Sequence, residues 1–208
     1  MQQIPLAIRL APQNSFASFL TGANRELIEQ LEACAAGQGE PYLYFWGGAG
    51  TGKTHLLQAA SQAAIDGQRR AAYIPLGDRG ELAPAMLDDL EGLQLICLDD
   101  VQHGCGQGPW EAALFDLFNR LRENGRHLLV SADRPPGQLP LELPDLRSRL
   151  AWGPCYQVRP LDDEACLELL RRAAAERGMH LDDAIGRFIL NRYPRDAGRL
   201  VRLIERLD

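Results

Sequence analysis

Apolar residues follow two patterns that alternate along this chain. Short, mostly apolar runs are separated by longer segments in which apolar residues recur every three or four positions. The runs predict strands at 42–46, 71–76, 93–98, 127–131 and 155–158, and the longer segments predict helices at 24–36, 55–60 and 109–123. Strands that alternate with helices favour an α/β fold, in which a parallel sheet is covered by helices on both faces.

After Pro160 the strand pattern stops. Amphipathic helices are predicted at 162–177, 182–192 and 196–207, with Asp162 and Asp182 as N-cap residues. We therefore expect three parts. They are an extended leader over residues 1–15, an α/β domain over residues 16–160 and a small helical domain over residues 161–208.

A glycine-rich loop, Gly47-Gly48-Ala49-Gly50-Thr51-Gly52-Lys53-Thr54, lies between the first predicted strand and the helix after it. It matches the pattern G-x-x-x-x-G-K-[ST] at every fixed position. The glycines let successive N–H groups point at a polyphosphate, Lys53 brings a positive charge to the outer phosphates, and the Thr54 hydroxyl can ligate Mg²⁺. We include the next residue, His55, among the candidate nucleotide-binding residues. The alternative is a flexible glycine loop with a chance lysine.

Two acids, Asp99 and Asp100, follow the strand predicted at 93–98. Carboxylates at the carboxyl end of a central strand, beside a phosphate loop, suit a site for Mg²⁺ and water. We assign Asp99 to the metal and Asp100 to the orientation of a water. The alternative is two exposed acids in a turn.

Asp133 closes the strand predicted at 127–131 and precedes two prolines. Its carboxylate could hydrogen-bond an attacking water or a terminal phosphate, or it could support the tight turn before the prolines. Spacing alone does not choose between these interpretations.

Two arginines, Arg147 and Arg149, lie beyond the predicted core strands. An arginine in such a place can reach a phosphate bound to a neighbouring subunit and stabilise the transition state of phosphoryl transfer. A surface helix with solvated arginines is the simpler interpretation of these residues taken alone.

The leader carries a short apolar pattern. Ile4, Leu6 and Ile8 share one face of an extended chain, and Pro5 favours that extended form. Together with Gln3, such a segment could dock into a groove as a linear motif. The simpler alternative is a leader that packs on its own domain or stays disordered.

Composition narrows the classes of function. The chain has 208 residues, of which 46% are hydrophobic, and its formal net charge of −6 weighs against extensive direct binding of DNA or an anionic membrane. No apolar run is long enough to cross a membrane, and the N-terminus lacks the features of a secretory signal. The five cysteines form no C-x-x-C pair and the histidines have no zinc-ligand spacing, so we expect reduced thiols in a cytoplasmic protein.

Several motifs, in this order, resemble those of a known family. Gly-Lys-Thr-His-Leu-Leu at 52–57, Leu-Asp-Asp-Val-Gln at 98–102, Leu-Phe-Asn at 117–119 and Ser-Ala-Asp-Arg-Pro-Pro at 131–136 resemble the AAA+ domain of the bacterial replication initiator DnaA. Phe16-x-x-Phe19-x-x-Gly22 resembles the stretch that precedes the nucleotide fold of that protein. The resemblance runs from about residue 12 to the end and implies a P-loop AAA+ core with a C-terminal helical lid.

The chain leaves no room for the helix-turn-helix DNA-binding domain or the long N-terminal region of the initiator. A short DnaA-like protein with a clamp-binding leader is similar to the Hda family. Gln3-Ile4-x-Leu6-x-Ile8 resembles the sliding-clamp motif of that family, which typically has Leu where this chain has Ile4. Pro144-Asp145-Leu146-x-Ser148-Arg149-Leu150-x-Trp152-Gly153 also resembles Hda sequences.

This resemblance implies a regulator. Hda-type proteins bind a nucleotide, here expected to be ADP or ATP with Mg²⁺, sit on DNA-loaded sliding clamps and stimulate the initiator DnaA to hydrolyse its own ATP. Arg149 matches the arginine that acts in trans, Asp99 and Asp100 match the acidic box, and Asp133 matches the first sensor. We expect weak intrinsic ATPase activity, no sequence-specific DNA binding, no membrane partner and the option of a homo-oligomer.

The lid departs from the family pattern in one respect. The register places Gly198 where the family has a lid arginine, and Arg199 follows one residue later. One step along a helix turns a side chain by about 100°, so Arg199 reaches the phosphates only if the helix is shifted. The chain also ends inside the lid, which leaves open that a last helix is missing.

A second hypothesis is a self-sufficient AAA+ ATPase, such as a helicase loader. The intact phosphate loop and the paired acids permit it, and it predicts substantial ATP hydrolysis without partners. Binding of origin DNA and a small-molecule kinase activity are less favoured by the charge and by the helical C-terminal part.

Overall fold

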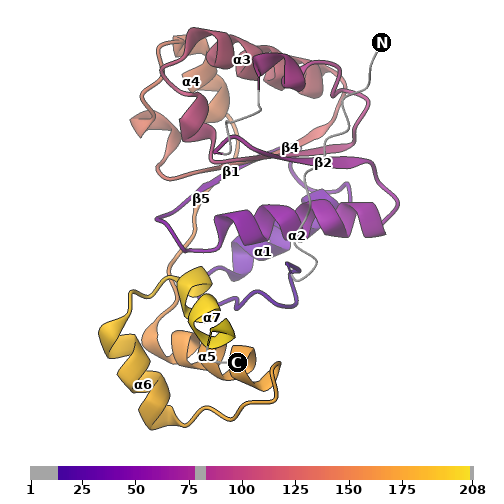
Figure 1. The fold of residues 1–208 in the computed structure, drawn as a ribbon. Helices are drawn as coiled ribbons and strands as arrows, with labels where there is room; N and C mark the ends of the chain where they lie inside the picture. Colours follow the sequence, from indigo (N-terminus) through magenta and orange to yellow (C-terminus); the bar gives the residue numbers. More distant parts are fainter. Residues whose placement is uncertain (1–13, 78–82, 207–208) are drawn as a thin grey trace.

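A five-stranded parallel sheet forms the centre of the larger part of the molecule (Figure 1). The computed structural model describes residues 14–77 and 83–206. The strands are β1 (Tyr42–Trp46), β2 (Ala71–Pro75), β3 (Leu95–Asp99), β4 (His127–Ala132) and β5 (Cys155–Gln157), in the order β2-β3-β4-β1-β5. Each corresponds to a predicted apolar run, and every neighbouring pair is parallel. The predicted α/β class is therefore confirmed.

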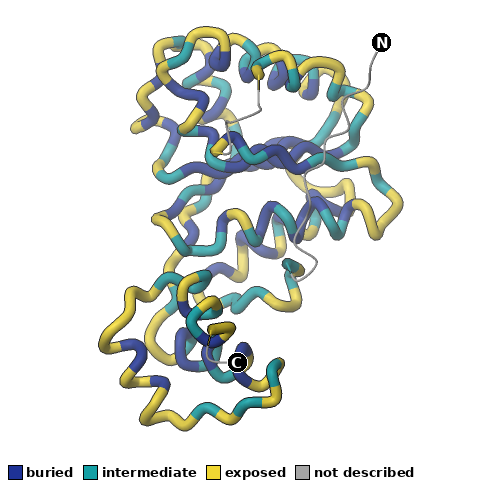
Figure 2. The backbone as a smooth tube through the Cα atoms, in the orientation of Figure 1, coloured by how far each residue is buried: buried dark blue, intermediate teal, exposed yellow. Residues whose placement is uncertain are grey.

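Helices cover both faces of the sheet (Figure 1). They are α1 (Arg25–Ala35) and α2 (Lys53–Asp66) on one face, and α3 (Gly108–Glu123) and α4 (Pro144–Leu150) on the other. Successive side chains of a strand point to opposite faces. Tyr42 and Tyr44 of β1 therefore pack under α3 and α4, whereas Leu43 and Phe45 pack under α1 and α2. The sheet is buried from both sides (Figure 2).

The C-terminal part is a separate small bundle with an apolar cluster of its own. It consists of α5 (Asp163–Ala175), α6 (Asp183–Arg192) and α7 (Ala197–Glu205). Asp162 caps α5 as predicted, because its carboxylate accepts a hydrogen bond from the N–H of Ala165 at 2.8 Å. Asp182 is the N-cap residue of α6, as predicted, but it does not cap the helix through its side chain. Its side chain makes no cap bond and instead lies 3.2 Å from the Nε2 atom of His180.

A buried asparagine joins the first helix to the segment that leads into the helical bundle. Asn24 is 4% exposed. Its amide nitrogen donates to the carbonyl of Arg159 at 3.0 Å, and its side-chain oxygen accepts from the N–H of Arg159 at 2.7 Å. The side chain thus pairs with the backbone as a neighbouring strand would, and it fixes the point at which the chain leaves the sheet.

The cysteines are unpaired and the helices are too short or too polar to span a membrane in the part of the chain that is described. All five cysteines are free thiols, and burial raises the pKa of Cys34 to about 11. Among the described residues, no helix is both long and apolar enough to cross a membrane.

We predict that Asn24→Ala lowers the free energy of unfolding by about 1–3 kcal/mol, because it leaves both backbone polar groups of Arg159 without a partner. Urea denaturation at equilibrium measures this change. Glu29→Ala, at an exposed position of the same helix, is the control and is expected to stay within about 0.5 kcal/mol of the wild type. An equal effect of the two substitutions would contradict the structural role of Asn24.

Candidate functional site

The glycine-rich loop connects the carboxyl end of β1 to the first residue of α2. Gly50 and Gly52 have φ angles of +73° and +94°, which side-chain-bearing L-residues rarely adopt. These glycines turn the chain sharply, so that α2 begins at Lys53 and directs its positive end at the loop. The fourteen-residue helix is anchored in the core by Leu56 and Leu57.

Lys53 is buried within the loop that it ends. Its Nζ atom donates to the carbonyl oxygens of Gly47 at 3.0 Å and Gly48 at 3.2 Å, which leaves one of its three N–H donors over. The N–H groups of Gly48, Ala49 and Gly50 donate to no acceptor among the described residues. A loop with spare backbone donors and a buried ammonium group fits a polyphosphate.

Asp99, 2% exposed, is the hub of the polar groups beside the loop. Its Oδ2 atom accepts hydrogen bonds from the hydroxyl groups of Thr54 and Tyr73, each at 2.7 Å, and its Oδ1 atom accepts one from Ser131. Burial and the neighbouring Asp99 carboxylate raise the pKa of Tyr73 well above its usual value, so Tyr73 remains a donor. The hydroxyl of Thr54 and the carboxylate of Asp99 are thus in contact, and both are oxygen ligands of the kind that Mg²⁺ prefers.

Asp100 and Asp133 are brought together by Gln102. The amide nitrogen of Gln102 donates to Asp100 at 3.0 Å, and its carbonyl oxygen accepts from the N–H of Asp133 at 3.2 Å. Asp100 has a φ of +57°, and its N–H donates to the Ser131 hydroxyl at 3.0 Å. Because β4 lies between β1 and β3, its end places Asp133 between the loop and the paired acids.

The carboxylate of Asp133 is occupied by its neighbour. Arg134 donates to both of its oxygens at 2.8 Å, and this hydrogen bonding holds the pKa of Asp133 below its usual value. Each oxygen of Asp133 accepts one of these bonds and keeps a lone pair that can accept another, so the pair with Arg134 does not prevent Asp133 from bonding a water.

Residues 14–19 cover the start of α2, a role that was not predicted from the sequence. A ring edge of Phe19 lies so close to Gly52 that a Cβ atom there would be 2.6 Å from it. Phe19 also packs edge-on against His55, with ring centroids 5.4 Å apart. The Nε2 atom of His55 is 2.8 Å from the carbonyl oxygen of Ser15, and burial lowers the pKa of His55. This segment forms one wall beside the loop.

The helical bundle contacts the loop through the residues before α7. The N–H of Ala197 donates to the carbonyl oxygen of Gly50 at 3.2 Å. A Cβ atom at Gly50 would lie 2.1 Å from the Cγ atom of Asp196, so this carboxylate rests on the loop backbone. The Asp196 side chain also caps α7 by accepting from the N–H of Arg199 at 2.8 Å. The N-terminus of α7 therefore packs on the phosphate loop at Gly50.

The side chain of Arg199 lies mostly in solvent. It is 66% exposed, and its Nε atom lies 3.8 Å from a carboxylate oxygen of Asp196. Arg202 instead folds back along the helix, and its Nη1 atom lies 3.3 Å from where a Cβ atom of Gly198 would be. Arg199 and Arg202 therefore lie beside Gly198, the position at which the family pattern has its lid arginine.

Arg149 lies on α4, on the face of the sheet opposite to α2 (Figure 1). Its guanidinium carbon is 5.9 Å from the ring centroid of Phe115, and its buried Nε atom has no hydrogen-bond partner among the described residues. Arg147 differs, since it donates to the carbonyl oxygens of Gly137 at 3.3 Å and Leu141 at 2.8 Å. Arg147 therefore holds the backbone, whereas the guanidinium of Arg149 is free of anionic partners within the part of the chain described.

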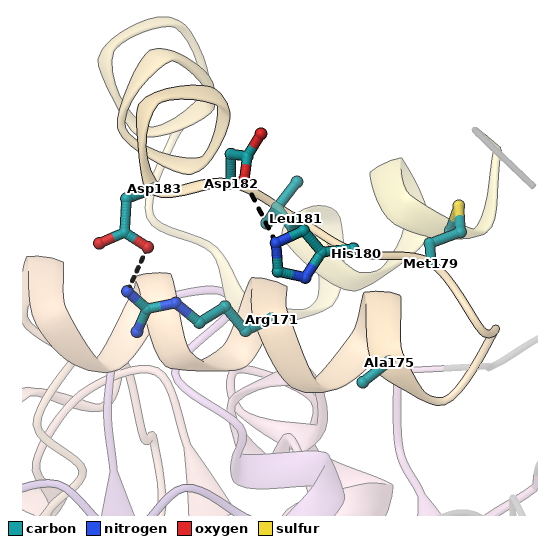
Figure 3. A pocket seen from close by; sticks show the side chains of 7 residues that line it. All are labelled: Arg171, Ala175, Met179, His180, Leu181, Asp182 and Asp183. Atoms are coloured by element: carbon teal, nitrogen blue, oxygen red, sulfur yellow. Dashed lines mark hydrogen bonds and ion pairs between the residues drawn. The ribbon is translucent and has the colours of Figure 1, made fainter.

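Two other features lie outside this arrangement. The leader residues Gln3, Ile4, Leu6 and Ile8 fall outside the described residues. A hollow of about 470 Å³ lies on the bundle between α5 and the start of α6 (Figure 3), where Arg171 pairs with Asp183 at 2.5 Å. The hollow is lined by residues of the bundle alone and contains none of the loop, so we assign no ligand to it.

Family comparisons cover nearly the whole chain. Residues 10–76 and 83–157 match the bacterial DnaA ATPase domain, and residues 162–208 match the Hda lid domain. An uncharacterized protein of Haemophilus influenzae is 40% identical over all 208 residues, which span 90% of its length.

Solved structures share the fold. Domain III of the Thermotoga maritima replication initiation protein DnaA is 25% identical with a TM-score of 0.81, over 95% of this chain and 88% of that one. DnaA from Aquifex aeolicus bound to AMPPCP is 23% identical with a TM-score of 0.77, over 94% of this chain and 66% of that one. These structures share the fold of this chain, and the Aquifex aeolicus protein is bound to AMPPCP, an analogue of ATP.

We predict that Gly50→Ala separates the lid from the loop, because the new methyl group would meet the Asp196 carboxylate and the φ of +73° is strained for alanine. Amide hydrogen exchange at Ala197 should become at least about tenfold faster. Gly48→Ala is the matched control, because no atom lies within 4 Å of a Cβ there. If Ala197 exchanged equally fast in both variants, the contact between lid and loop would not be the one described.

Proposed function

This chain belongs to the family of the bacterial DnaA ATPase domain and carries an Hda-type lid, and from this we propose that it regulates the initiation of DNA replication. In this proposal the nucleotide-bound protein sits on a DNA-loaded sliding clamp and stimulates the initiator DnaA to hydrolyse its ATP. Loss of the ATP form of the initiator then represses re-initiation. The protein acts in the cytoplasm, without direct sequence-specific binding of DNA.

The placement of Arg149 carries this proposal. Its guanidinium lies on the opposite side of the sheet from α2 and has no anionic partner among the described residues. An arginine so placed is available to a phosphate on another molecule, where it can stabilise the charge that develops in phosphoryl transfer. Arg147, two residues away, is tied to backbone carbonyls and is not available in the same way.

The phosphate loop of this protein holds ADP or ATP in the same proposal. Residues 47–54 would surround the phosphates with backbone N–H groups and Lys53, and His55 lies under the covering segment. Thr54 and Asp99 would hold Mg²⁺, which neutralises phosphate charge when it is bound. Asp100 and Asp133 would order water at the outer phosphate, and Arg199 would have to move inward to contact it.

The lid contact supports a structural use of the nucleotide. Asp196 brings a negative charge onto the loop at Gly50, and the N–H of Ala197 is bonded there. A bound nucleotide changes the charge beside Asp196, so it changes how the lid rests on the core. We therefore expect the nucleotide to fix the shape that presents Arg149, with weak intrinsic turnover of ATP.

A self-sufficient ATPase, such as a helicase loader, is the second candidate. The complete loop and the Thr54–Asp99 contact favour it. It predicts substantial steady-state hydrolysis by the purified protein, whereas the regulator hypothesis predicts strong hydrolysis only when the initiator and the loaded clamp are present.

We predict that Arg149→Ala reduces stimulated hydrolysis by the initiator on the order of 10³-fold while the variant still binds nucleotide. Arg149→Lys should restore little, because an ammonium group lacks the planar fork of guanidinium. Hydrolysis of initiator-bound ATP in the presence of DNA-loaded clamp measures this. Arg25→Ala, which removes an exposed arginine from α1, is the control. Full stimulation by Arg149→Ala would refute the assignment.

We also predict that Gln3→Ala weakens binding to the sliding clamp, because the leader motif Gln3-Ile4-x-Leu6-x-Ile8 is proposed to dock on it. A pull-down with purified clamp and wild-type or variant protein measures this, and Gln13→Ala, in the leader but outside the motif, is the control. Clamp binding that is unchanged in Gln3→Ala would reject the leader as the clamp-binding segment.

A further inference from the structure

Glu111 is a buried carboxylate that the proposed chemistry does not use. It lies in the first turn of α3 and is 1% exposed. No lysine or arginine forms an ion pair with it among the described residues. A buried carboxylate without a cation is stable only when hydrogen-bond donors surround it.

Backbone N–H groups provide these donors, and they come from two loops. Glu111 accepts hydrogen bonds from the N–H of Gly106 at 2.7 Å, from that of Leu143 at 2.6 Å, and from that of Glu142 at 3.1 and 3.0 Å to its two oxygens. Leu143 is the N-cap residue of α4, and Pro144 begins that helix. Glu111 therefore holds the residues from which the helix of Arg149 starts.

Two further contacts fix the same short helix. The hydroxyl of Tyr42, in the buried start of β1, donates to the carbonyl oxygen of Leu150 at 2.9 Å, at the end of α4. Phe115, one turn after Glu111 on α3, lies under the guanidinium of Arg149. Helix α4 has only seven residues, so it makes few stabilising bonds of its own and depends on these anchors for its place.

We infer that Glu111 is a positioning residue for Arg149. By binding the N–H groups of Glu142 and Leu143, its carboxylate fixes the start of α4. The start of α4 in turn fixes the position of the Arg149 guanidinium over the ring of Phe115. This inference rests on the proposed function of Arg149. A displacement of about 1 Å in a catalytic contact can lower a rate on the order of 100-fold, so loss of this anchor should appear in the stimulated rate.

The test is Glu111→Gln, which is nearly isosteric but replaces one acceptor oxygen by an NH₂ group that faces backbone donors. Stimulated hydrolysis of initiator-bound ATP is measured against the concentration of the variant, with DNA-loaded clamp present. We expect the maximal rate to fall about tenfold or more, with the half-maximal concentration and the nucleotide affinity of the variant unchanged. Asp116→Asn makes the same change of charge at an exposed position of α3 and should behave like wild type.

The outcomes separate this inference from the proposed function. If Arg149→Ala abolishes stimulation and Glu111→Gln retains the full maximal rate, the inference is wrong and the proposed function stands. If Glu111→Gln changes nucleotide affinity along with the maximal rate, Glu111 has a general structural role and the inference is also wrong. Full stimulation by Arg149→Ala would contradict both the proposed role of Arg149 and the inference about Glu111. Should Glu111→Gln fail to fold, Glu111→Asp, which keeps the charge but is one methylene shorter, is judged by the same criteria.

Discussion

The hydrogen bond between Thr54 and Asp99 joins the two halves of the candidate site. The hydroxyl belongs to the first turn of α2, directly after the loop that follows β1, and the carboxylate belongs to the end of β3. Strand β4 lies between β1 and β3. The 2.7 Å contact is possible because all strands are parallel, so their carboxyl ends meet at one edge of the sheet. The hydroxyl of Ser131 on β4 completes the bridge, so the loop, the acids and Asp133 occupy one continuous polar layer.

The cationic side chains that matter to the proposed function lie in three different parts of the structure. Lys53 lies inside the phosphate loop, and the lid arginines lie around Gly198. Arg149 lies on the other side of the sheet, on a short helix that the core holds at both ends. In the proposed function this separation lets the nucleotide of the protein set its shape while Arg149 acts on the ATP of a partner. The Asp196 contact at Gly50 is the physical connection between nucleotide and lid in that account.

Local patterns predicted much of the fold and part of the site. The apolar runs predicted all five strands of the sheet. The loop from Gly47 to Thr54 was recognised because its pattern consists of consecutive residues. The sequence named Thr54 and Asp99 as candidate Mg²⁺ ligands, but it did not predict the hydrogen bond between their side chains, which joins the first turn of α2 to the end of β3. The assigned roles of these residues remain proposals.

Other features depended on residues that are distant in the sequence. Asn24 pairs with Arg159, 135 positions away, and Glu111 meets Leu143, 32 positions away, so neither has a local signature. The contact of Asp196 with Gly50 required the packing of the lid on the core. Asp182 occupies the predicted N-cap position of α6, but its side chain pairs with His180, two residues away, and makes no cap bond.

A single-turnover experiment tests most directly where the chemistry takes place. The initiator is loaded with γ-labelled ATP, freed of unbound nucleotide, and mixed with DNA-loaded clamp and this protein carrying either ADP or AMPPCP, neither of which it can hydrolyse. Rapid release of the label with both forms is the predicted result, because the hydrolysed ATP belongs to the initiator. Release that is accelerated only when this protein is supplied with hydrolysable ATP would contradict the account.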